Sequence, residues 1–323
     1  MFTVHGQVAC KGFSITRRCG RLIAHGSMVR YDRWMAEQRH NLVVGGDSVI
    51  GRALVNYYNR AGIPVCATTR RNCEVGSGRI FLDLGEVPQK WALPEDVEVA
   101  YLCAAVSRTI PCRRDPEGTW LINVERVVRL AESLLVRGGR VVFLSTNQVF
   151  SGKTPCAGVD QPPRPVSEYG RQKAEAERRL LGLGSGVVVV RLSKVIHQGD
   201  ALLTGWVKRL REGRVIQPLC DYHVAPLRLD FVVEALTAVA GGEGLYQLSG
   251  TKDISYAEVG TYLAARVGAY EHLVQPRTTA ESGLELEAFG PHTTLDSSRL
   301  LEHTGLMPPD VWKAVDIVLE SGE

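Results

Sequence analysis

The sequence has no pair of cysteines or histidines at the spacing of a metal site. Its eight cysteines are scattered at positions 10, 19, 66, 73, 103, 112, 156 and 220, without a Cys-x-x-Cys pair. We therefore expect no metal, and reduced thiols typical of a cytoplasmic protein. The chain also has no apolar run near the roughly 20 residues that a membrane-spanning helix needs. A cytoplasmic location with no membrane partner is predicted.

A large surplus of charge of one sign is also missing. The 323 residues carry a net charge of +3, and residues 1–40 hold seven basic against two acidic side chains. The remaining residues therefore sum to −2, which favours no nucleic-acid partner. We interpret residues 1–40 as a basic extension, either flexible or preceding a true start at Met28 or Met35. An organellar presequence is the alternative interpretation.

From residue 41 onward, apolar runs alternate with stretches of helical periodicity. Strands are expected in 40–46, 63–71, 78–84, 97–106, 140–146 and 186–196, with long helices in 48–62, 119–139 and 169–182. Continuous Val, Ile and Leu runs are typical of strands buried on both faces. Strict alternation predicts an α/β fold with a doubly wound parallel (Rossmann) sheet.

Two regions are predicted within this body. Residues 41–192 would form the dinucleotide-binding domain, and residues 193–323 mainly a smaller substrate-binding lobe. In this prediction, the segment 221–240 can fold back and become part of the main domain. No internal repeat suggests a different organisation.

A glycine-rich loop follows the first predicted strand and opens the first helix. The stretch "VVGGDSVIG" places Gly45, Gly46 and Gly51 there. Glycines let the backbone approach a pyrophosphate, and the helix N-terminus offers free N–H groups. Ser48 stands where such loops usually carry a glycine, which would reduce the room for phosphates.

The end of the second strand bears on the choice of dinucleotide. NAD-binding loops usually have an acid about 20 residues on, whereas this chain has Thr69, Arg70 and Arg71, and no acid before Glu74. A guanidinium can bind a 2′-phosphate that a carboxylate would repel. NADP(H) is therefore the favoured cofactor, with NAD(H) left open.

The stretch "SEYGRQKAEAERRL" places Tyr169 four residues before Lys173, on one face of a helix. An ammonium one turn from a phenol would lower the pKa of that phenol from its ordinary value of about 10. Ser145 and Thr146 end the fifth strand, at the sheet edge where ligands bind. A tyrosine four residues before a lysine is common by chance. The motifs around Tyr169 and Lys173 are what favour proton-transfer chemistry here.

The order of these motifs resembles the extended short-chain dehydrogenase/reductase family. The resemblance is carried by "GGDSVIG", "TTRR", "FLDL", "LCAAV", "INVERVVRLAE", "FLSTNQVFSG", "SEYGRQKAEAE", "VVRLSKVI" and "PHTTLDSSRL". It runs from about residue 41 to the C-terminus and is nearest to the dTDP-4-dehydrorhamnose reductase and sugar-nucleotide-binding branch. This resemblance implies an NADP(H)-dependent oxidoreductase that reduces a nucleotide-linked keto-sugar, as a homodimer.

The resemblance also implies roles for individual residues. Tyr169 would be the catalytic acid, Lys173 would tune it and hold the nicotinamide ribose, and Thr146 would bind the reacting oxygen. The expected cofactor contacts are Gly45, Asp47, Ser48, Val49, Ile50, Gly51, Arg70, Arg71, Asp83, Leu84, Ala104, Ala105 and Lys173. Asp83 and Leu84 would lie at the adenine.

The sequence departs from the reductase pattern where the substrate should bind. It reads Ser-Thr-Asn-Gln-Val-Phe where the family's reductases read Ser-Thr-Asp-Tyr-Val-Phe, and Lys194 stands where they place a tryptophan. Asn147, Lys194 and Arg277 are the predicted substrate contacts. A sugar-nucleotide epimerase and a non-catalytic dinucleotide-binding regulator remain open alternatives, whereas a dehydratase lacks its acidic pair.

Overall fold

The computed structural model describes residues 39–76, 78–284 and 290–320. These residues belong to one compact unit, Gln38–Glu323. The basic extension predicted from the sequence lies outside the described residues, except for its last two positions.

The described residues are built on a seven-stranded sheet in the order β10-β6-β5-β4-β1-β2-β3. All of its neighbouring strands pair in parallel. The strands are β1 (His40–Val44), β2 (Val65–Thr69), β3 (Arg79–Phe81), β4 (Val97–Leu102), β5 (Arg140–Thr146), β6 (Val187–Leu192) and β10 (Gly244–Leu248). The predicted doubly wound parallel sheet is confirmed. The sequence predicted six of its strands, and the structure adds β10 as a seventh.

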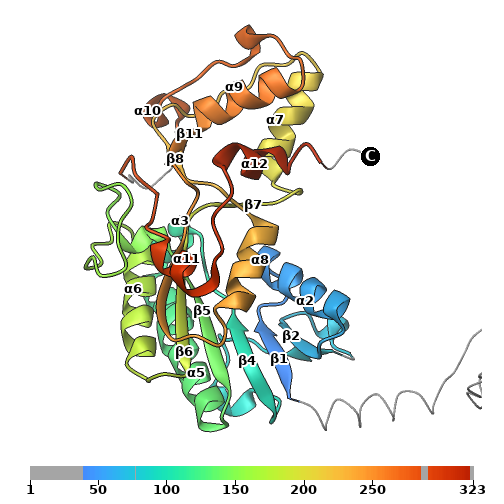
Figure 1. Ribbon diagram of the computed structural model, residues 1–323, viewed down its shortest axis with the longest axis vertical. Coiled ribbons are helices and arrows are strands. Elements are labelled where there is room, and N and C mark those ends of the chain that lie inside the picture. The colour runs from blue at the N-terminus through green and yellow to red at the C-terminus, as the bar shows by residue number, and fades with distance from the viewer. Residues whose placement is uncertain (1–38, 77, 285–289, 321–323) are drawn as a thin grey trace, which may run out of the picture. The chain divides into compact units, whose positions relative to one another are not determined.

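Helices cover both faces of the sheet (Figure 1). α2 (Val49–Ala61) and α8 (Leu229–Ala238) pack on one face, and α5 (Val127–Val136) and α6 (Glu168–Leu181) on the other. Alternate residues of a strand point to opposite faces, so Val43 joins the first core and Leu42 and Val44 join the second. Burial of β1 on both faces explains its continuous apolar sequence.

The two helices that border the predicted site start at serine caps. Ser48 Oγ accepts a hydrogen bond from the Gly51 N–H at the start of α2, and Ser167 Oγ accepts one from Gly170 at the start of α6. Helix α2 ends at Gly62, whose φ of 68° is a left-handed conformation that glycine adopts without strain. These local signals fix where each helix begins relative to the strand before it.

A separate apolar cluster lies outside the sheet, among α7 (Ala201–Arg211), α9 (Tyr256–Arg266) and α12 (Val311–Asp316). Figure 1 shows these helices beyond one end of the sheet. The smaller elements are η1 (Asn72–Glu74), η2 (Pro88–Lys90), α3 (Thr109–Arg114), α4 (Pro116–Trp120), η3 (Leu121–Arg126), η4 (Asn147–Val149), β7 (Val195–Ile196), β8 (His223–Val224), β9 (Leu227–Arg228), β11 (Ile254–Ser255), η5 (Glu271–Leu273), α10 (Thr279–Ser282) and α11 (Ser298–Thr304). Helix α8, from the segment 221–240, packs against α2. The boundaries of the two regions stay a prediction.

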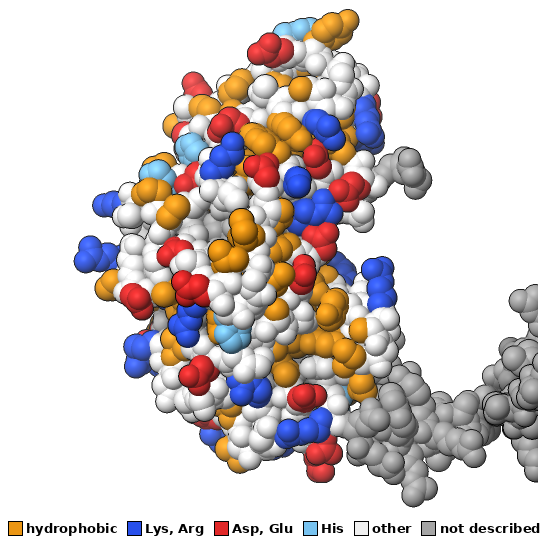
Figure 2. Space-filling view, in the orientation of Figure 1, with side chains coloured by type: hydrophobic (Ala, Val, Ile, Leu, Met, Phe, Trp, Pro, Cys, Tyr) orange, Lys and Arg blue, Asp and Glu red, His pale blue; other side chains and the backbone are white. Residues whose placement is uncertain are grey.

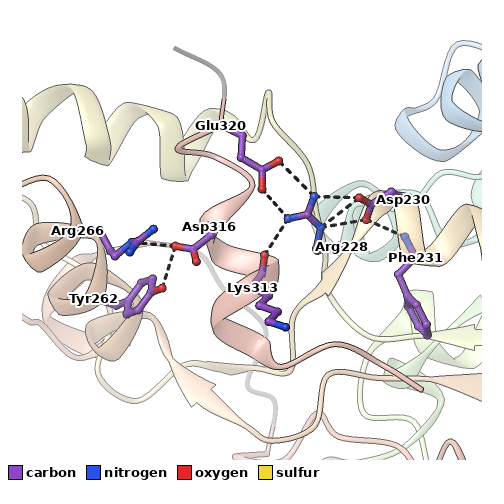
Figure 3. A network of polar contacts seen from close by, with 8 residues as sticks. All are labelled: Arg228, Asp230, Phe231, Tyr262, Arg266, Lys313, Asp316 and Glu320. Carbon is purple, nitrogen blue, oxygen red and sulfur yellow. Dashed lines mark hydrogen bonds and ion pairs between the residues drawn. The ribbon is translucent and has the colours of Figure 1, made fainter. Parts of the chain in front are cut away.

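Arg228 ties α12 to the strand that leads into α8 (Figure 3). Its guanidinium donates to Glu320 Oε1 at 2.8 Å, to the Lys313 carbonyl at 3.2 Å and to Asp230 Oδ2 at 2.9 Å. In the same figure the Tyr262 hydroxyl donates to Asp316 at 2.8 Å. Polar contacts therefore connect the last helix both to α8 and to α9.

The surface shown in Figure 2 mixes basic and acidic side chains. No helix within the described ranges is long and apolar enough to cross a bilayer.

Candidate active site

A cavity of about 680 Å³ opens at the carboxyl ends of β1, β2, β3 and β4. The strands are parallel, so the loops that follow them meet at one edge of the sheet. Its lining includes the sequence-predicted residues Gly45, Asp47, Ser48, Arg70, Arg71, Asp83, Leu84, Ala104 and Ala105. Another cavity, of about 720 Å³, lies near the amino ends of β5 and β10. None of the predicted site residues lines it.

The glycine loop is tightly packed. Gly45 has a φ of +86°, and a Cβ there would lie 2.7 Å from the backbone nitrogen of Ala104. A Cβ on Gly51 would lie 2.3 Å from the Gly45 carbonyl oxygen. Both positions therefore need glycine, which keeps the loop close to β4 and leaves the cavity open.

Ser48 has a structural role that the sequence pattern does not show. Its Oγ accepts a hydrogen bond from the Gly51 N–H at 3.0 Å, so it caps α2 from within the loop. Val49 and Ile50 begin α2, and neither is among the residues that line the cavity. Ile50 packs against the core between the sheet and α2 and α8.

A network of charged residues surrounds the end of β2. The Thr69 hydroxyl donates to Asp47 Oδ2 at 2.8 Å, and Arg79 donates to Asp47 Oδ1 at 2.9 Å and to Glu74 at 2.6 Å. Arg71 pairs with Glu74 at 2.7 Å. Burial opposes ionisation of Asp47, but the bonds from Thr69 and Arg79 outweigh it and lower the pKa of the carboxyl. Asp47 is therefore a carboxylate at neutral pH.

Tyr169 and Lys173 are both buried on α6, with exposures of 8% and 3%. Lys173 Nζ donates to the Leu144 carbonyl at 2.5 Å and lies 3.9 Å from the centre of the Phe143 ring. Burial lowers the pKa of Lys173 to about 7, although the negative charge of Glu177 opposes this. Its charge can therefore change near neutral pH.

The pKa of Tyr169 moves in the opposite direction to that expected from the sequence. Burial raises it, and Cys112 adds to the effect. The cause is that the phenol is removed from water, which disfavours the phenolate. This environment therefore stabilises the neutral phenol of Tyr169, which is the form that can donate a proton.

Thr146 is the last residue of β5, and Lys173 reaches the same strand from α6 through its bond to the Leu144 carbonyl. The Thr146 Oγ accepts from the Gln148 N–H at 3.2 Å and donates to Asn147 Oδ1 at 3.4 Å. Cys103, which lines the cavity at the end of β4, and Lys173 influence each other's pKa. Cys103 lines the cavity, whereas Lys173, Tyr169 and Thr146 are not among its lining residues.

Asn123 connects the cavity wall to α6 from a π-helical turn, η3. Its Oδ1 accepts from the Val106 N–H at 2.8 Å, and its Nδ2 donates to the Val106 carbonyl at 2.9 Å and to Gln172 Oε1 at 2.8 Å. Gln172 directly precedes Lys173, so Asn123 fixes the helix at the lysine. Turns of this type often occur at functional sites.

The three predicted substrate contacts are not brought together by any bond between them. Asn147 accepts from Thr146, Lys194 pairs with Asp200 at 3.2 Å, and Arg277 is exposed. The backbone N–H of Arg277 donates to the Pro218 carbonyl at 2.9 Å, and its carbonyl accepts from Cys220. Arg277 thus contributes to a short backbone pairing in the outer cluster of helices.

Several site residues were missed by sequence reasoning. Thr68 Oγ1 accepts from the Gly45 N–H at 2.9 Å, and Arg79 contacts Asp47 across 32 positions of chain. Cys103 and Arg108 line the cavity. The "TTRR" stretch could have suggested Thr68, but no local signal links Arg79 to the glycine loop.

This cavity, glycine loop and sheet order define a dinucleotide-binding α/β fold of the kind found in sugar-nucleotide enzymes. The chain belongs to the RmlD substrate binding domain family, whose sequence model matches residues 39–321. The resemblance to the dTDP-4-dehydrorhamnose reductase branch is thereby confirmed.

Individual proteins agree with this assignment. The chain is 28% identical over 181 residues to methionine adenosyltransferase 2 subunit beta of Xenopus tropicalis, covering 55% of this chain and 51% of that protein. It thus spans about half the length of that relative. It is 24% identical over 292 residues to dTDP-4-dehydrorhamnose reductase of Mycolicibacterium smegmatis, covering 84% and 82%.

A solved structure shows the same fold. The dTDP-4-dehydrorhamnose reductase from Bacillus anthracis in complex with NADP superposes with a TM-score of 0.76 at 17% identity. The match covers 88% of this chain and 99% of the other.

Proposed function

We propose that this protein is an NADP(H)-dependent reductase of a nucleotide-linked keto-sugar, similar to dTDP-4-dehydrorhamnose reductase. The observation that carries the proposal is the placement of Lys173. Its ammonium bonds to the Leu144 carbonyl near the end of β5, one helical turn from Tyr169 on α6. Family membership over residues 39–321 supports the same conclusion.

In this proposal the cavity would hold the dinucleotide, which would supply the hydride for the reduction. The glycine loop and the N-terminus of α2 would hold the pyrophosphate, Asp83 and Leu84 the adenine, and Arg70 a 2′-phosphate.

The chain's own residues would handle the proton. Tyr169 is buried in its neutral form and would donate its hydroxyl proton to the carbonyl oxygen of the sugar. Lys173 would stabilise the phenolate that forms and bind the nicotinamide ribose. Thr146 would turn its hydroxyl from Asn147 to the reacting oxygen.

The test measures NADPH and NADH oxidation by the purified full chain with a panel of nucleotide-linked 4-keto-sugars. Turnover with NADPH that falls by at least about a hundredfold in Tyr169→Phe supports the reductase. Equal turnover in wild type and Tyr169→Phe contradicts the role of Tyr169. Absence of turnover on every sugar, together with tight dinucleotide binding, contradicts the reductase.

A regulatory role is the second candidate, because relatives found by sequence include methionine adenosyltransferase 2 subunit beta proteins. Asn147 and Lys194 also depart from the reductase pattern. In that case the cavity would bind a dinucleotide and the protein would act on a partner without turnover. The experiment above separates the two, since only the reductase consumes NADPH.

A cytoplasmic location and a homodimer packed through α5 and α6 are also proposed. Exposed ion pairs lie on this side, including Arg179 of α6 with Glu125 at 2.8 Å, which links α6 to η3, the turn that leads into α5. Val136 adds an apolar side chain that is 89% exposed. A solution-scattering mass equal to one chain would contradict the dimer.

A further inference from the structure

The cavity of about 720 Å³ near the amino ends of β5 and β10 has no part in the proposed reaction. It lies at the edge of the sheet opposite to the dinucleotide cavity, and within the described ranges no residue lines both. Two arginines, Arg140 and Arg299, contribute to its wall together with Tyr246 and His303. Cationic and hydrogen-bonding side chains thus surround an open space away from the proposed active site.

Arg140, the first residue of β5, is held in this wall by main-chain oxygens. Its Nε donates to the Ala240 carbonyl at 3.0 Å, and its Nη2 donates to the carbonyls of Gly242 and Ser185. Among the described residues it has no carboxylate partner. Carbonyl groups are neutral, so these bonds fix the guanidinium in place and leave its positive charge uncompensated.

Arg299, on α11, is positioned in a similar way. Its Nη2 donates to the Glu243 carbonyl at 3.2 Å, and its guanidinium lies 5.0 Å from the centre of the buried Tyr246 ring. No carboxylate of the described chain forms an ion pair with it, although Glu243 and Glu302 also line the cavity. A stacked guanidinium is already ordered, so a ligand that binds it loses little affinity to side-chain entropy.

Gly242 leaves the space between these groups open. A Cβ at this position would lie 2.6 Å from the Tyr246 hydroxyl oxygen and 3.4 Å from His303 Nε2. The hydroxyl and the ring nitrogen therefore lie beside the backbone of Gly242, where each can donate a hydrogen bond. Two further donor groups thus accompany the two guanidinium groups.

This set of donors fits a phosphate. A guanidinium presents its N–H groups as a planar fork that matches the oxygens of a phosphate. A phosphate group on a small molecule carries about two negative charges and three acceptor oxygens, which is enough for both arginines. Arg140 and Arg299 are each partly buried, and an anion offsets the cost of burying a guanidinium without a counter-charge. Glu243 and Glu302 oppose an anion, so the affinity should be modest.

We propose that this cavity binds the phosphate group of a small molecule through Arg140 and Arg299. Inorganic phosphate and a phosphate monoester share this chemistry, and the experiment distinguishes between them. The cavity does not overlap the glycine loop, so its ligand would not compete with a dinucleotide. The inference does not depend on the proposed function.

The experiment titrates inorganic phosphate, and separately glycerol phosphate, into the purified full chain by calorimetry. Ionic strength is fixed, with chloride as the balancing anion. We expect saturable binding of at least one probe with a dissociation constant of about 1 mM or lower, and the tighter probe identifies the kind of ligand. In Arg299→Gln, which keeps a hydrogen-bond donor and removes the charge, this constant should rise at least about tenfold.

Arg70→Gln is the matched control, because it removes the same charge from the dinucleotide cavity. We expect it to change the dissociation constant by less than about twofold. Weakening in Arg70→Gln and not in Arg299→Gln would mean that phosphate binds in the dinucleotide cavity. Equal weakening in both variants would mean that it responds to the general charge of the protein. Either result would overturn the inference.

Glu302→Gln tests the same cavity with the opposite sign. Glu302 is exposed and lines the cavity, so removal of its negative charge should tighten phosphate binding about twofold or more without disturbing the core. Weaker or unchanged binding in this variant would contradict the proposed site, even if Arg299→Gln failed to fold. Absence of saturable binding of both probes up to about 20 mM would also overturn the inference.

Discussion

Lys173 should make the stability of this protein increase with pH above neutrality. Its ammonium is buried, and burial lowers its pKa from 10.5 to about 7. Between these values the unfolded chain holds a proton on Lys173 that the folded chain has lost. Stability therefore rises with pH across this window, because the unfolded state binds more protons.

The magnitude follows from the two pKa values. The full gap corresponds to about 4–5 kcal/mol of unfolding free energy, a cost that the folded protein bears in full below pH 7. Between pH 7.5 and pH 9.5 the wild type should recover about 2 kcal/mol relative to a variant with no charge at this position. Lys173→Met is that variant, and it should also abolish turnover.

The assay is urea unfolding of wild type and Lys173→Met at pH 6.5, 7.5, 8.5 and 9.5. The difference between the two free energies removes the titration of all other groups. Lys173→Gln, a second neutral side chain, should give the same slope against pH. A difference that stays constant within about 0.5 kcal/mol, or that falls with pH, would refute the argument.

Three other predictions test the scaffold around the cavity. Gly45→Ala should weaken dinucleotide binding at least about tenfold, because its Cβ would meet Ala104; unchanged affinity in calorimetry would contradict this. Asn123→Ala should lower the unfolding free energy by about 2–3 kcal/mol, since it leaves buried partners at Val106 and Gln172 unsatisfied. Denaturant melts measure this change, with Asn123→Asp as the matched variant. Arg228→Ala should cost about 1–2 kcal/mol in the same assay, with Arg228→Lys recovering only part, and a neutral result would show that the α12 contacts are dispensable.

The site was predictable from the sequence wherever its chemistry follows from local order. The glycine loop could be predicted because Gly45 directly follows an apolar run and Gly51 stands six residues later. Both glycines are sterically required in the structure. Tyr169 and Lys173 share a helical face because residues four apart do so in any α-helix. The direction of the pKa of Tyr169 could not be predicted, since burial is set by segments distant in the sequence.

By itself, the sequence determined the alternation of buried strands and helices, the parallel sheet and the order of the motifs. These depend on hydrophobic periodicity and on caps such as Ser48 and Ser167, which act within a few residues. Only the tertiary structure decided that β10 joins the sheet, and that Asp47 meets Thr69 and Arg79. The physical reason is that these contacts join residues 22 and more positions apart, and packing of the whole sheet is what brings them together.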